Sequence, residues 1–477
     1  LDFARQFSHL ISGDECWTVM VCNGKGVFMK AVQHDMTSGN PMRIILNFTL
    51  PIFIGNVFQQ FYNMADTIIV GKFVGTGALA AVGSVGTIVF LIIGFLQGLT
   101  AGFSVLTAQR FGAGDMKNMR KSVGTACVLS VIITVIMTAG SMLGMKRLLE
   151  FMNTPEDIFA DAYAYIMIIC GGIAATVLYN LLSGILRALG DSKTPLYFLI
   201  LSALLNVGLD LFFIIVFHMG VAGAAYATVI SQGVSGIGCL IYIVKKVPLL
   251  KMQAEDFRPE GYLVKMEMAV GIPMALQYSI TAIGTMMVQS SLNLLGSLSV
   301  AAFTAANKIE SVVTQAYVAL GTTMATYCAQ NIGAGDIKRI RRGFKSATIM
   351  GSVYGVILAV PMMTVGKYLV YLFVSDNVGD IIGQVDIYLK CVGLFLIPLT
   401  VVNVYRNGIQ GMGYGLLPMM AGVAELLGRG GVAIWASWKR SYVGACMASP
   451  AAWILAGSLL LVMYFWIMKK QSRYLER

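Results

Sequence analysis

Long apolar stretches follow one another along almost the whole chain, and short polar or Gly/Pro-containing breaks separate them. A stretch of about 20 apolar residues is long enough to cross the hydrocarbon core of a membrane as a helix. The chain is 57% hydrophobic and only 12% charged, whereas soluble domains carry about 25% charged residues. The pattern therefore predicts an all-α polytopic membrane protein. We expect twelve transmembrane helices, at 44–70, 79–108, 122–145, 159–181, 196–217, 221–245, 267–293, 299–329, 345–366, 383–404, 415–436 and 443–468.

The apolar pattern also occurs twice. The motif Gln-x-x-Gly-Ala-Gly-Asp at 109–115 returns at 330–336, and each copy follows a long apolar segment and leads into a basic cluster. Other matching pairs are Pro51 with Pro273, Asn180 with Asn403, and Pro195 with Pro418. Duplicated apolar halves are typical of transporters that rock one half against the other around a central site. We expect two six-helix repeat lobes, related by an axis along the membrane normal, with a central cavity between them.

The remaining segments are short. Residues 1–35 carry no long apolar run and no signal-peptide pattern. We interpret them as a poorly defined leader or an over-called start, with Met36 as the natural beginning. The expected organisation is a leader (1–35), an N-lobe (36–245), a cytoplasmic linker (246–265), a C-lobe (266–470) and a cytoplasmic tail (471–477).

Charge sets the orientation and excludes some partners. The net charge is +11, but the Lys and Arg residues gather in alternate loops, which is the pattern of membrane topology and not of nucleic-acid binding. Both termini are therefore expected in the cytoplasm, most simply of a bacterium with the protein in its cell membrane. The eight cysteines form no CxxC pair and there are three histidines, so we expect no disulfide framework, structural metal site or cofactor. We expect a monomer whose partners are the bilayer and small molecules.

Two carboxylates inside predicted spans are the main candidates for function. Asp66 lies late in the first span and Asp210 in the fifth, where Asn206 precedes it by four residues on the same helix face. Placing a charged side chain in the hydrocarbon core costs at least about 2.5–3.5 kcal/mol on insertion scales, so a charged residue within a span indicates a function. Carboxylate, amide and hydroxyl oxygens together could hold a proton or a Na⁺. The alternative is that both are helix-end carboxylates wetted at the membrane surface.

Other polar or conformationally special residues have simpler interpretations. Lys308 and Glu310 are two apart on one helix, so they are expected to be separate polar points of the cavity. Glu425 and Arg429, at i and i+4, favour an internal ion pair. The tandem GxxxG positions Gly94, Gly98 and Gly102 favour tight helix packing. Pro51 and Pro273 are candidate hinges, although static bending explains them equally well.

Motifs in order along the chain indicate a family. Residues 36–41, the stretch from Pro51 to Thr67, Gly71–Gly75, Ala78–Gly83, the two Gln-x-x-Gly-Ala-Gly-Asp motifs and Leu186–Asp191 resemble a MATE (multidrug and toxic compound extrusion) transporter, and its DinF-like branch in particular. The resemblance covers about residues 36–470. It implies export of amphipathic, often cationic compounds driven by inward movement of H⁺ or Na⁺. By the same resemblance Asp66, Asn206, Asp210 and Thr228 are cation-coupling positions, and Tyr62 and Asn180 are neighbouring polar positions.

One departure limits the resemblance. The NorM-like branch has a cation-site glutamate in the seventh span, but here that face offers Gln277, Ser279 and Thr281. The position equivalent to Asp66 in the second half is near Val288. We therefore place coupling in the N-lobe alone.

Two rival functions are weighed against export. A lipid-linked saccharide flippase shares this architecture but is expected to carry several cavity Arg or Lys residues for pyrophosphate, and few central basic residues are visible (Lys308, Lys390, Arg429). A membrane-embedded enzyme would need a nucleophile, base or metal constellation within the spans. The sequence shows no phosphate loop, HExxH or GxSxG pattern, so an enzyme is the more remote alternative.

Overall fold

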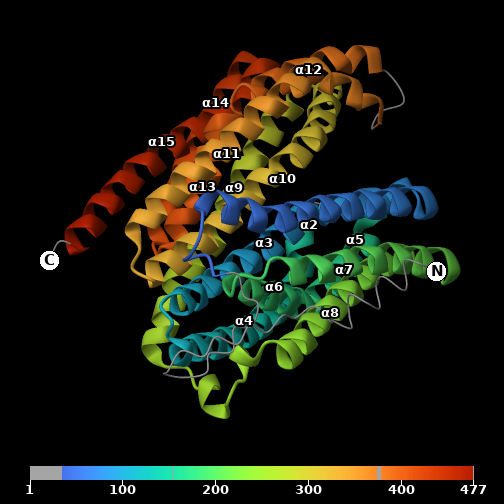
Figure 1. The fold of residues 1–477 in the computed structure, drawn as a ribbon. Helices are drawn as coiled ribbons and strands as arrows, with labels where there is room; N and C mark the ends of the chain where they lie inside the picture. Colours follow the sequence, from blue (N-terminus) through green and yellow to red (C-terminus); the bar gives the residue numbers. More distant parts are fainter. Residues whose placement is uncertain (1–34, 153, 373–377, 476–477) are drawn as a thin grey trace, which may run out of the picture.

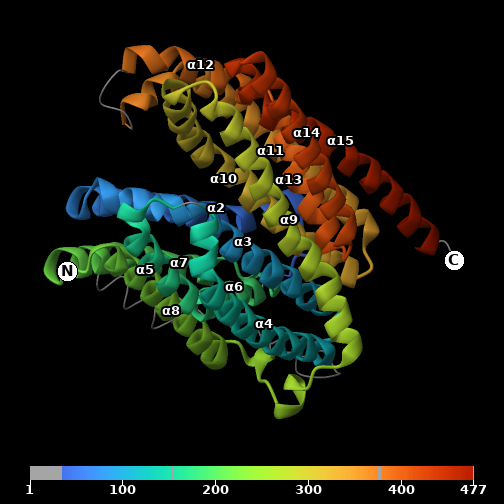
Figure 2. The ribbon, with the colours of Figure 1, turned by 180° about the vertical axis from the view of Figure 1, so that it is seen from behind.

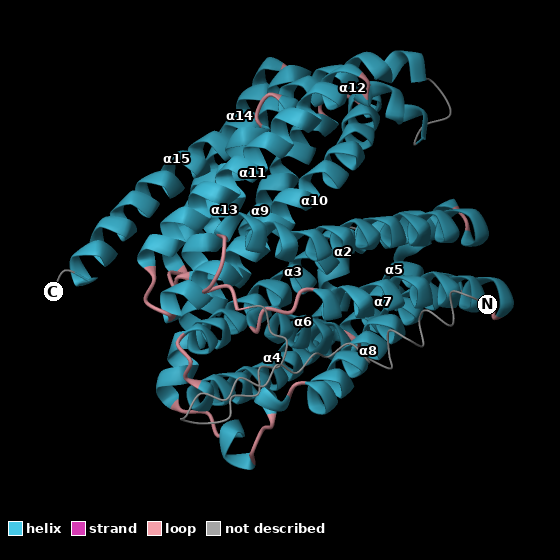
Figure 3. Cartoon of the chain, viewed as in Figure 1, coloured by secondary structure: helices cyan, strands magenta, loops and turns pink. Residues whose placement is uncertain are grey.

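The computed structural model describes residues 35–152, 154–372 and 378–475, and in these ranges it contains helices and loops without any β-strand (Figures 1 and 3). The first half of the chain forms one bundle, the N-lobe. Its helices are α2 (Pro41–Ile69), α3 (Thr76–Gly112), α4 (Met116–Phe151), α5 (Glu156–Gly171), α6 (Ile173–Ala188), α7 (Lys193–Leu211) and α8 (Gly220–Lys246), with π-helical ends η1 (Val70–Val74) after α2 and η2 (Phe212–Val216) after α7.

The second half forms the C-lobe. It contains α9 (Gly261–Asn293), α10 (Ser297–Gly333), α11 (Ile337–Thr364), the 3₁₀ segment η5 (Gly366–Leu372), α12 (Val378–Gly393), α13 (Leu396–Gly411), α14 (Leu416–Lys439) and α15 (Tyr442–Leu475). Two short 3₁₀ turns, η3 (Pro248–Leu250) and η4 (Ala254–Phe257), connect the lobes. The connection packs on α4, where a Cβ on Gly124 would lie 1.9 Å from the carbonyl oxygen of Asp256.

Each of the twelve predicted spans corresponds to one helix or to one pair of helices. Eight helices of the described chain are long and apolar enough to cross a membrane, and two more spans are bent pairs: α5 with α6 at 45°, and α12 with α13 at 50°. The sequence pattern predicts one span at each of these places and gives no sign of a bend. At the first bend Gly172 leaves room for α8, because a Cβ there would lie 2.2 Å from Cγ2 of Val229. The helices α9 and α10, which correspond to the remaining two predicted spans, are also long enough to cross a membrane, but polar residues recur along them.

The duplicated motif folds twice into the same turn. Gly114 and Gly335 have φ of 72° and 74°, a left-handed conformation that favours glycine because it has no Cβ. The aspartate that follows each glycine caps the next helix: Asp115 accepts from the backbone N–H of Asn118 (3.2 Å) and Asp336 from that of Arg339 (2.8 Å). The repeat seen in the sequence is thus a structural repeat.

Each lobe has its own apolar core and an apolar outer surface. Two buried clusters fill the N-lobe, and one large cluster that includes Tyr327, Phe344 and Tyr388 fills most of the C-lobe. Large apolar side chains also point outward; on α4, Leu143 is 85% exposed and Val131 is 64% exposed. Such a surface suits contact with lipid chains better than contact with water.

The lobes converge at one end of the molecule, where α3 crosses α9 (Figure 2). A Cβ on Gly98 would lie 2.6 Å from the carbonyl oxygen of Met274, and one on Gly102 would lie 2.4 Å from Cα of Gly271. The GxxxG prediction of tight packing is therefore confirmed. Gly83 lies about three turns before Gly94 on the same face, yet a Cβ there would meet no atom within 4 Å. The contact is thus confined to the second half of α3, and the ribbons of the two lobes diverge toward the other end (Figure 1).

Candidate functional site

The two candidate carboxylates meet inside the N-lobe, where α2, α7 and α8 pack together. Asp210 is fully buried and Asn206 is 2% exposed, so Asp210 is not a wetted helix-end residue. Asp66 is half-buried, and its Oδ1 is shielded from solvent. The amide of Asn206 donates to the hydroxyl of Thr228 at 3.4 Å, which links α7 to α8. The carboxyl groups of Asp66 and Asp210 interact with each other across the α2–α7 interface. The structure therefore brings together the four cation-coupling candidates.

Aromatic and amide side chains complete this polar cluster. Tyr62 lies one turn before Asp66, near the side chains of Gln59 and Gln232 and near both carboxylates. Tyr165 of α5 lies within reach of the same charges. Asn180 donates to the carbonyl of Thr176 in its own helix at 2.9 Å, and so is not joined to the cluster by a bond of its amide N–H.

Several oxygens of this polar cluster lack donors. Among the residues that the structure describes, no hydrogen-bond donor reaches these buried oxygens: Oδ1 of Asp66, Oδ1 of Asn206, Oδ1 and Oδ2 of Asp210, and Oε1 of Gln232. A buried polar group without a partner is costly, and two like charges side by side in a medium of low dielectric repel each other. A proton shared by the carboxyl groups, or a cation between them, would remove both costs. Oxygen atoms alone are the ligands that a hard cation takes.

The other buried carboxylates differ, because each already has a partner. Glu267 accepts from the hydroxyl of Ser122 (3.0 Å), Glu310 accepts from the hydroxyl of Tyr388, and Glu425 binds two arginines. Glu267, which sequence reasoning missed, keeps one oxygen without a donor. The described part of the chain contains no group of three or more His, Cys, Asp or Glu residues arranged to hold a metal ion. The Asp66–Asp210 cluster is therefore the best candidate for reversible cation binding.

Lys308 and Glu310 do not face each other, as their spacing predicts. Glu310 is buried between α10 and α12, where Tyr388 donates to it and Asn307 contacts the Tyr388 hydroxyl at 3.2 Å. Lys308 is exposed. Pro51 and Pro273 lie inside the long helices α2 and α9, and their role as hinges stays a prediction.

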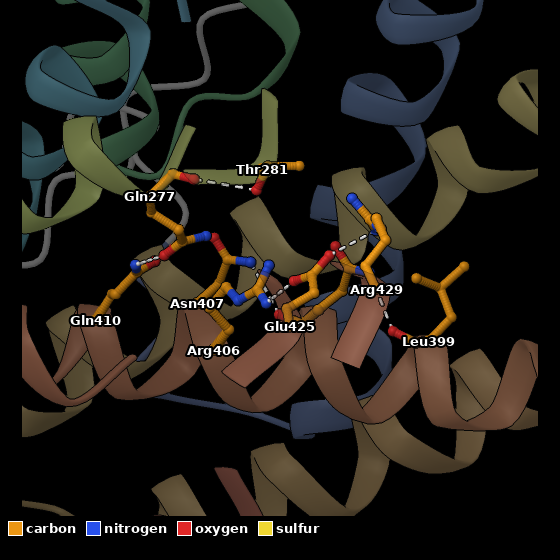
Figure 4. Close-up of polar contacts among 9 residues, drawn as sticks. Gln277, Thr281, Leu399, Arg406, Asn407, Gln410, Glu425 and Arg429 are labelled. Atoms are coloured by element: carbon orange, nitrogen blue, oxygen red, sulfur yellow. Dashed lines mark hydrogen bonds and ion pairs between the residues drawn. The ribbon is translucent and has the colours of Figure 1, made fainter. Parts of the chain in front are cut away.

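A cluster of charged and polar residues occupies the C-lobe between α9, α13 and α14 (Figure 4). Glu425 pairs with Arg429 at 2.9 Å, which confirms the predicted i, i+4 ion pair, and its other oxygen pairs with Arg406 at 2.5 Å. The amides of Gln410 and Gln277 join α13 to α9 at 2.8 Å.

The position of Arg406 differs from the one that the sequence predicts. That interpretation ends the tenth span at residue 404 and leaves Arg406 in a loop, whereas α13 continues to Gly411. A signal for this was present in the sequence: Asn403, Arg406, Asn407 and Gln410 recur at i, i+3, i+4 and i+7, which is one face of a helix.

These features define a polytopic helical membrane protein of two repeat lobes with a polar site in one of them. The sequence profile of the family described as MatE matches residues 51–212 and 270–429. The chain therefore belongs to the MATE family. Members of this family are transporters and not enzymes, so the chain is a multi-pass membrane transporter.

Individual relatives agree with this assignment. The "Probable multidrug resistance protein YpnP" of Bacillus subtilis (strain 168) is 33% identical over 383 residues, which cover 80% of this chain and 84% of the relative. A "FAD transporter" of Shewanella oneidensis is 24% identical over 437 residues, which cover 89% and 94% of the two chains. A solved structure, "Crystal structure of MATE in complex with MaL6", superposes with a TM-score of 0.87 at 23% identity and covers 93% of this chain and 100% of that one, which supports the fold.

Proposed function

We propose that this transporter exports amphipathic, often cationic compounds in exchange for inward movement of H⁺ or Na⁺ by alternating access. The observation that carries the proposal is the Asp66–Asp210 pair, in which three of the four carboxylate oxygens are buried without a donor, whereas the buried Glu267, Glu310 and Glu425 each have a partner. The name of the Bacillus relative, a probable multidrug resistance protein, supports the class of substrate. Assignment to the DinF-like branch belongs to the same proposal.

In this proposal the coupling ion binds between α2, α7 and α8. Asp66 and Asp210 take the proton, or supply two oxygens to Na⁺, and the oxygens of Asn206 and Thr228 complete the site. Binding cancels the repulsion between two carboxylates, and it therefore favours the arrangement of α2 and α7 that brings them closest. A ligand can shift the two states of a transporter only by its differential affinity for them. Outward release of substrate follows if the ion-bound arrangement holds substrate more weakly.

The membrane orientation is part of the proposal. The turns at 113–115 and 334–336, together with the basic clusters that follow them, lie at the end where the lobes converge. Lys and Arg gather in cytoplasmic loops, so this end faces the cytoplasm and the divergent end faces outward. We place the protein in the cell membrane of a bacterium, with both termini inside.

Charge pairing disfavours the flippase alternative. A pyrophosphate-binding cavity needs free basic groups. Of the three basic residues considered for that role, Arg429 pairs with Glu425, and Lys390 pairs with Asp386 at 2.5 Å. Lys308 is exposed, and one free basic group is fewer than the several that such a cavity is expected to carry.

Gradient-driven uptake into inside-out vesicles tests the proposal. A fluorescent organic cation is supplied under a proton gradient and, separately, under a Na⁺ gradient, with Asp66→Asn and Asp210→Asn beside the unmodified protein. We expect uptake under one of the gradients and its loss in both variants. The control is Asp386→Asn, which removes a C-lobe carboxylate that pairs with Lys367 and Lys390, and it should retain uptake.

Two results would contradict the proposal. Unchanged uptake in both Asp variants would mean that the coupling site is elsewhere. An absence of uptake under either gradient, in protein whose folding is confirmed by size-exclusion chromatography, would remove cationic export and return attention to lipid-linked substrates.

A further inference from the structure

The two lobes are joined at their convergent end by a reciprocal pair of hydrogen bonds. The amide of Gln109, in α3 of the N-lobe, donates to the carbonyl of Gly411 in the C-lobe at 2.9 Å. The amide of Gln330, in α10 of the C-lobe, donates to the carbonyl of Ala188 in the N-lobe at 2.8 Å. These glutamines are the first residues of the two duplicated motifs, so the same interaction is made twice, once in each direction.

The acceptors are also equivalent. Ala188 is the last residue of α6 and Gly411 is the last residue of α13. The final carbonyls of a helix have no N–H partner within the helix and need one from elsewhere. Each glutamine therefore satisfies a helix end of the opposite lobe, and separating the lobes would leave amides and carbonyls to be paired by water.

The backbones approach each other very closely at the same place. A Cβ on Gly112 would lie 1.9 Å from the carbonyl oxygen of Gln330, and a Cβ on Gly333 would lie 2.0 Å from that of Gln109. No side chain fits there without moving one helix. The glycine of each motif is therefore required for the closed arrangement by a steric reason that is independent of the hydrogen bonds.

The segment of chain that precedes α2 reinforces the contact between the lobes from one side. The backbone N–H of Met36 donates to Oε1 of Gln330 at 3.0 Å, and the guanidinium of Arg339 donates to the carbonyls of Met36, Ser38 and Gly39 at 3.0, 2.7 and 2.7 Å. Met36 is fully buried. The start of the N-lobe is thus held by the C-lobe beside one of the two glutamines.

We infer that Gln109, Gly112, Gln330 and Gly333 form a two-fold latch that holds the convergent end closed and must open during each transport cycle. This inference rests on the proposed alternating access. The latch assigns a function to the duplicated motif: the glutamines supply bonds that exist only when the end is closed, and the glycines permit the approach. Since both bonds connect rigid helix ends, they form and break together with the movement of the lobes.

Distance measurement between the lobes tests the latch without any substrate. In a background lacking the eight native cysteines, spin labels are attached at Lys117→Cys and Lys338→Cys, which are exposed, equivalent positions of α4 and α11. The separation is measured by pulsed electron paramagnetic resonance in nanodiscs. The double variant Gln109→Ala/Gln330→Ala should raise the ratio of long to short separations on the order of tenfold, because each hydrogen bond contributes a factor of a few.

The matched control is Gln315→Ala. Gln315 lies on α10 as Gln330 does, but its amide bonds to the carbonyl of Ser311 in its own helix (3.2 Å), so the distance distribution should stay that of the unmodified protein. A distribution in the double variant identical to that of the control would overturn the latch.

The glycines give a second, independent arm. Gly112→Ala and Gly333→Ala should each shift the distribution to long separations, although alanine favours a helix more than glycine does. Gly144→Ala, on α4 with no atom within 4 Å of the added Cβ, is the control. Short separations retained in Gly112→Ala and Gly333→Ala would refute the steric part of the inference. A shifted distribution in a protein that shows no gradient-driven uptake would keep the latch and reject only the proposed coupling.

Discussion

The C-lobe cluster allows a prediction in which two neighbouring substitutions have very different costs. Arg406, Glu425 and Arg429 have side chains exposed by only 11%, 7% and 9%, and they lie within the spans α13 and α14. The cluster holds two guanidinium groups and one carboxylate. Replacing Glu425 by Gln leaves both guanidinium groups without a counter-charge, whereas replacing Arg429 by Gln leaves the Arg406–Glu425 pair intact.

The magnitudes follow from this arrangement. Removing one partner of a buried ion pair costs about 3–5 kcal/mol, since an uncompensated charge stays behind. Glu425→Gln should therefore lower the free energy of unfolding by about that amount or more. Arg429→Gln should cost about 1–2 kcal/mol, because it removes one charge-assisted hydrogen bond and leaves no charge alone.

Thermal unfolding of detergent-purified protein, followed by the loss of the monodisperse peak on size-exclusion chromatography, measures the difference. We expect Glu425→Gln to have a much lower midpoint temperature than Arg429→Gln. The double variant Arg406→Gln/Arg429→Gln leaves Glu425 without a counter-charge, so it should lie closer to Glu425→Gln than to the single Arg429 variant. The control Asp386→Asn affects ion pairs whose lysines, Lys367 and Lys390, are 32% and 54% exposed, and it should lower the midpoint much less than Glu425→Gln does. Equal losses in Glu425→Gln and Arg429→Gln would refute the reasoning that counter-charge, and not the number of bonds, decides the stability here.

Two further predictions concern packing and buried hydrogen bonds. Tyr388→Phe removes the donor to the buried Glu310 and should cost about 1–3 kcal/mol, measurable as a lower midpoint in the same assay; an unchanged midpoint would mean that another donor replaces the hydroxyl. Gly343→Ala places a Cβ 2.1 Å from Cε1 of the buried Tyr327 and should destabilise the C-lobe by about 1–3 kcal/mol through overpacking, whereas Gly144→Ala should be neutral or slightly stabilising. A stable Gly343→Ala protein would show that the Tyr327 ring can move aside.

Hydropathy predicts the spans well but not their shape. A run of apolar residues determines where a helix crosses the membrane, because every backbone polar group must be satisfied within it. The bends after Gly171 and Gly393 depend instead on what packs beside them, such as Val229 against Gly172. The tenth span is predicted to end too early for the same reason. Arg406 is a polar residue that suggests a loop in the sequence, and only the structure shows that it pairs with Glu425 of a neighbouring helix.

The candidate site could be predicted only in part. Asp66 and Asp210 stand out in the sequence because they are charged residues in apolar surroundings, and the structure adds that they meet each other. The motif of Gln109 and Gln330 was visible as a repeat, but its role was not. Its acceptors, the carbonyls of Gly411 and Ala188, are 302 and 142 residues away along the chain, and backbone carbonyls leave no mark in a sequence.

The two repeats differ at the positions that form the candidate ion site. The spacing of the repeated prolines makes Val288 the counterpart of Asp66 and Ala433 the counterpart of Asp210, and both pack in a single apolar cluster of the C-lobe. The same spacing makes Arg429 the counterpart of Asn206. The C-lobe thus keeps the charged pair Glu425–Arg429 on α14, and Glu425 also pairs with Arg406 of α13. Among the described residues, no ion pair involves Asp66 or Asp210. A bound proton or cation would supply the counter-charge that these two carboxylates lack, and this difference is the reason for which we propose the N-lobe as the half that senses the ion gradient.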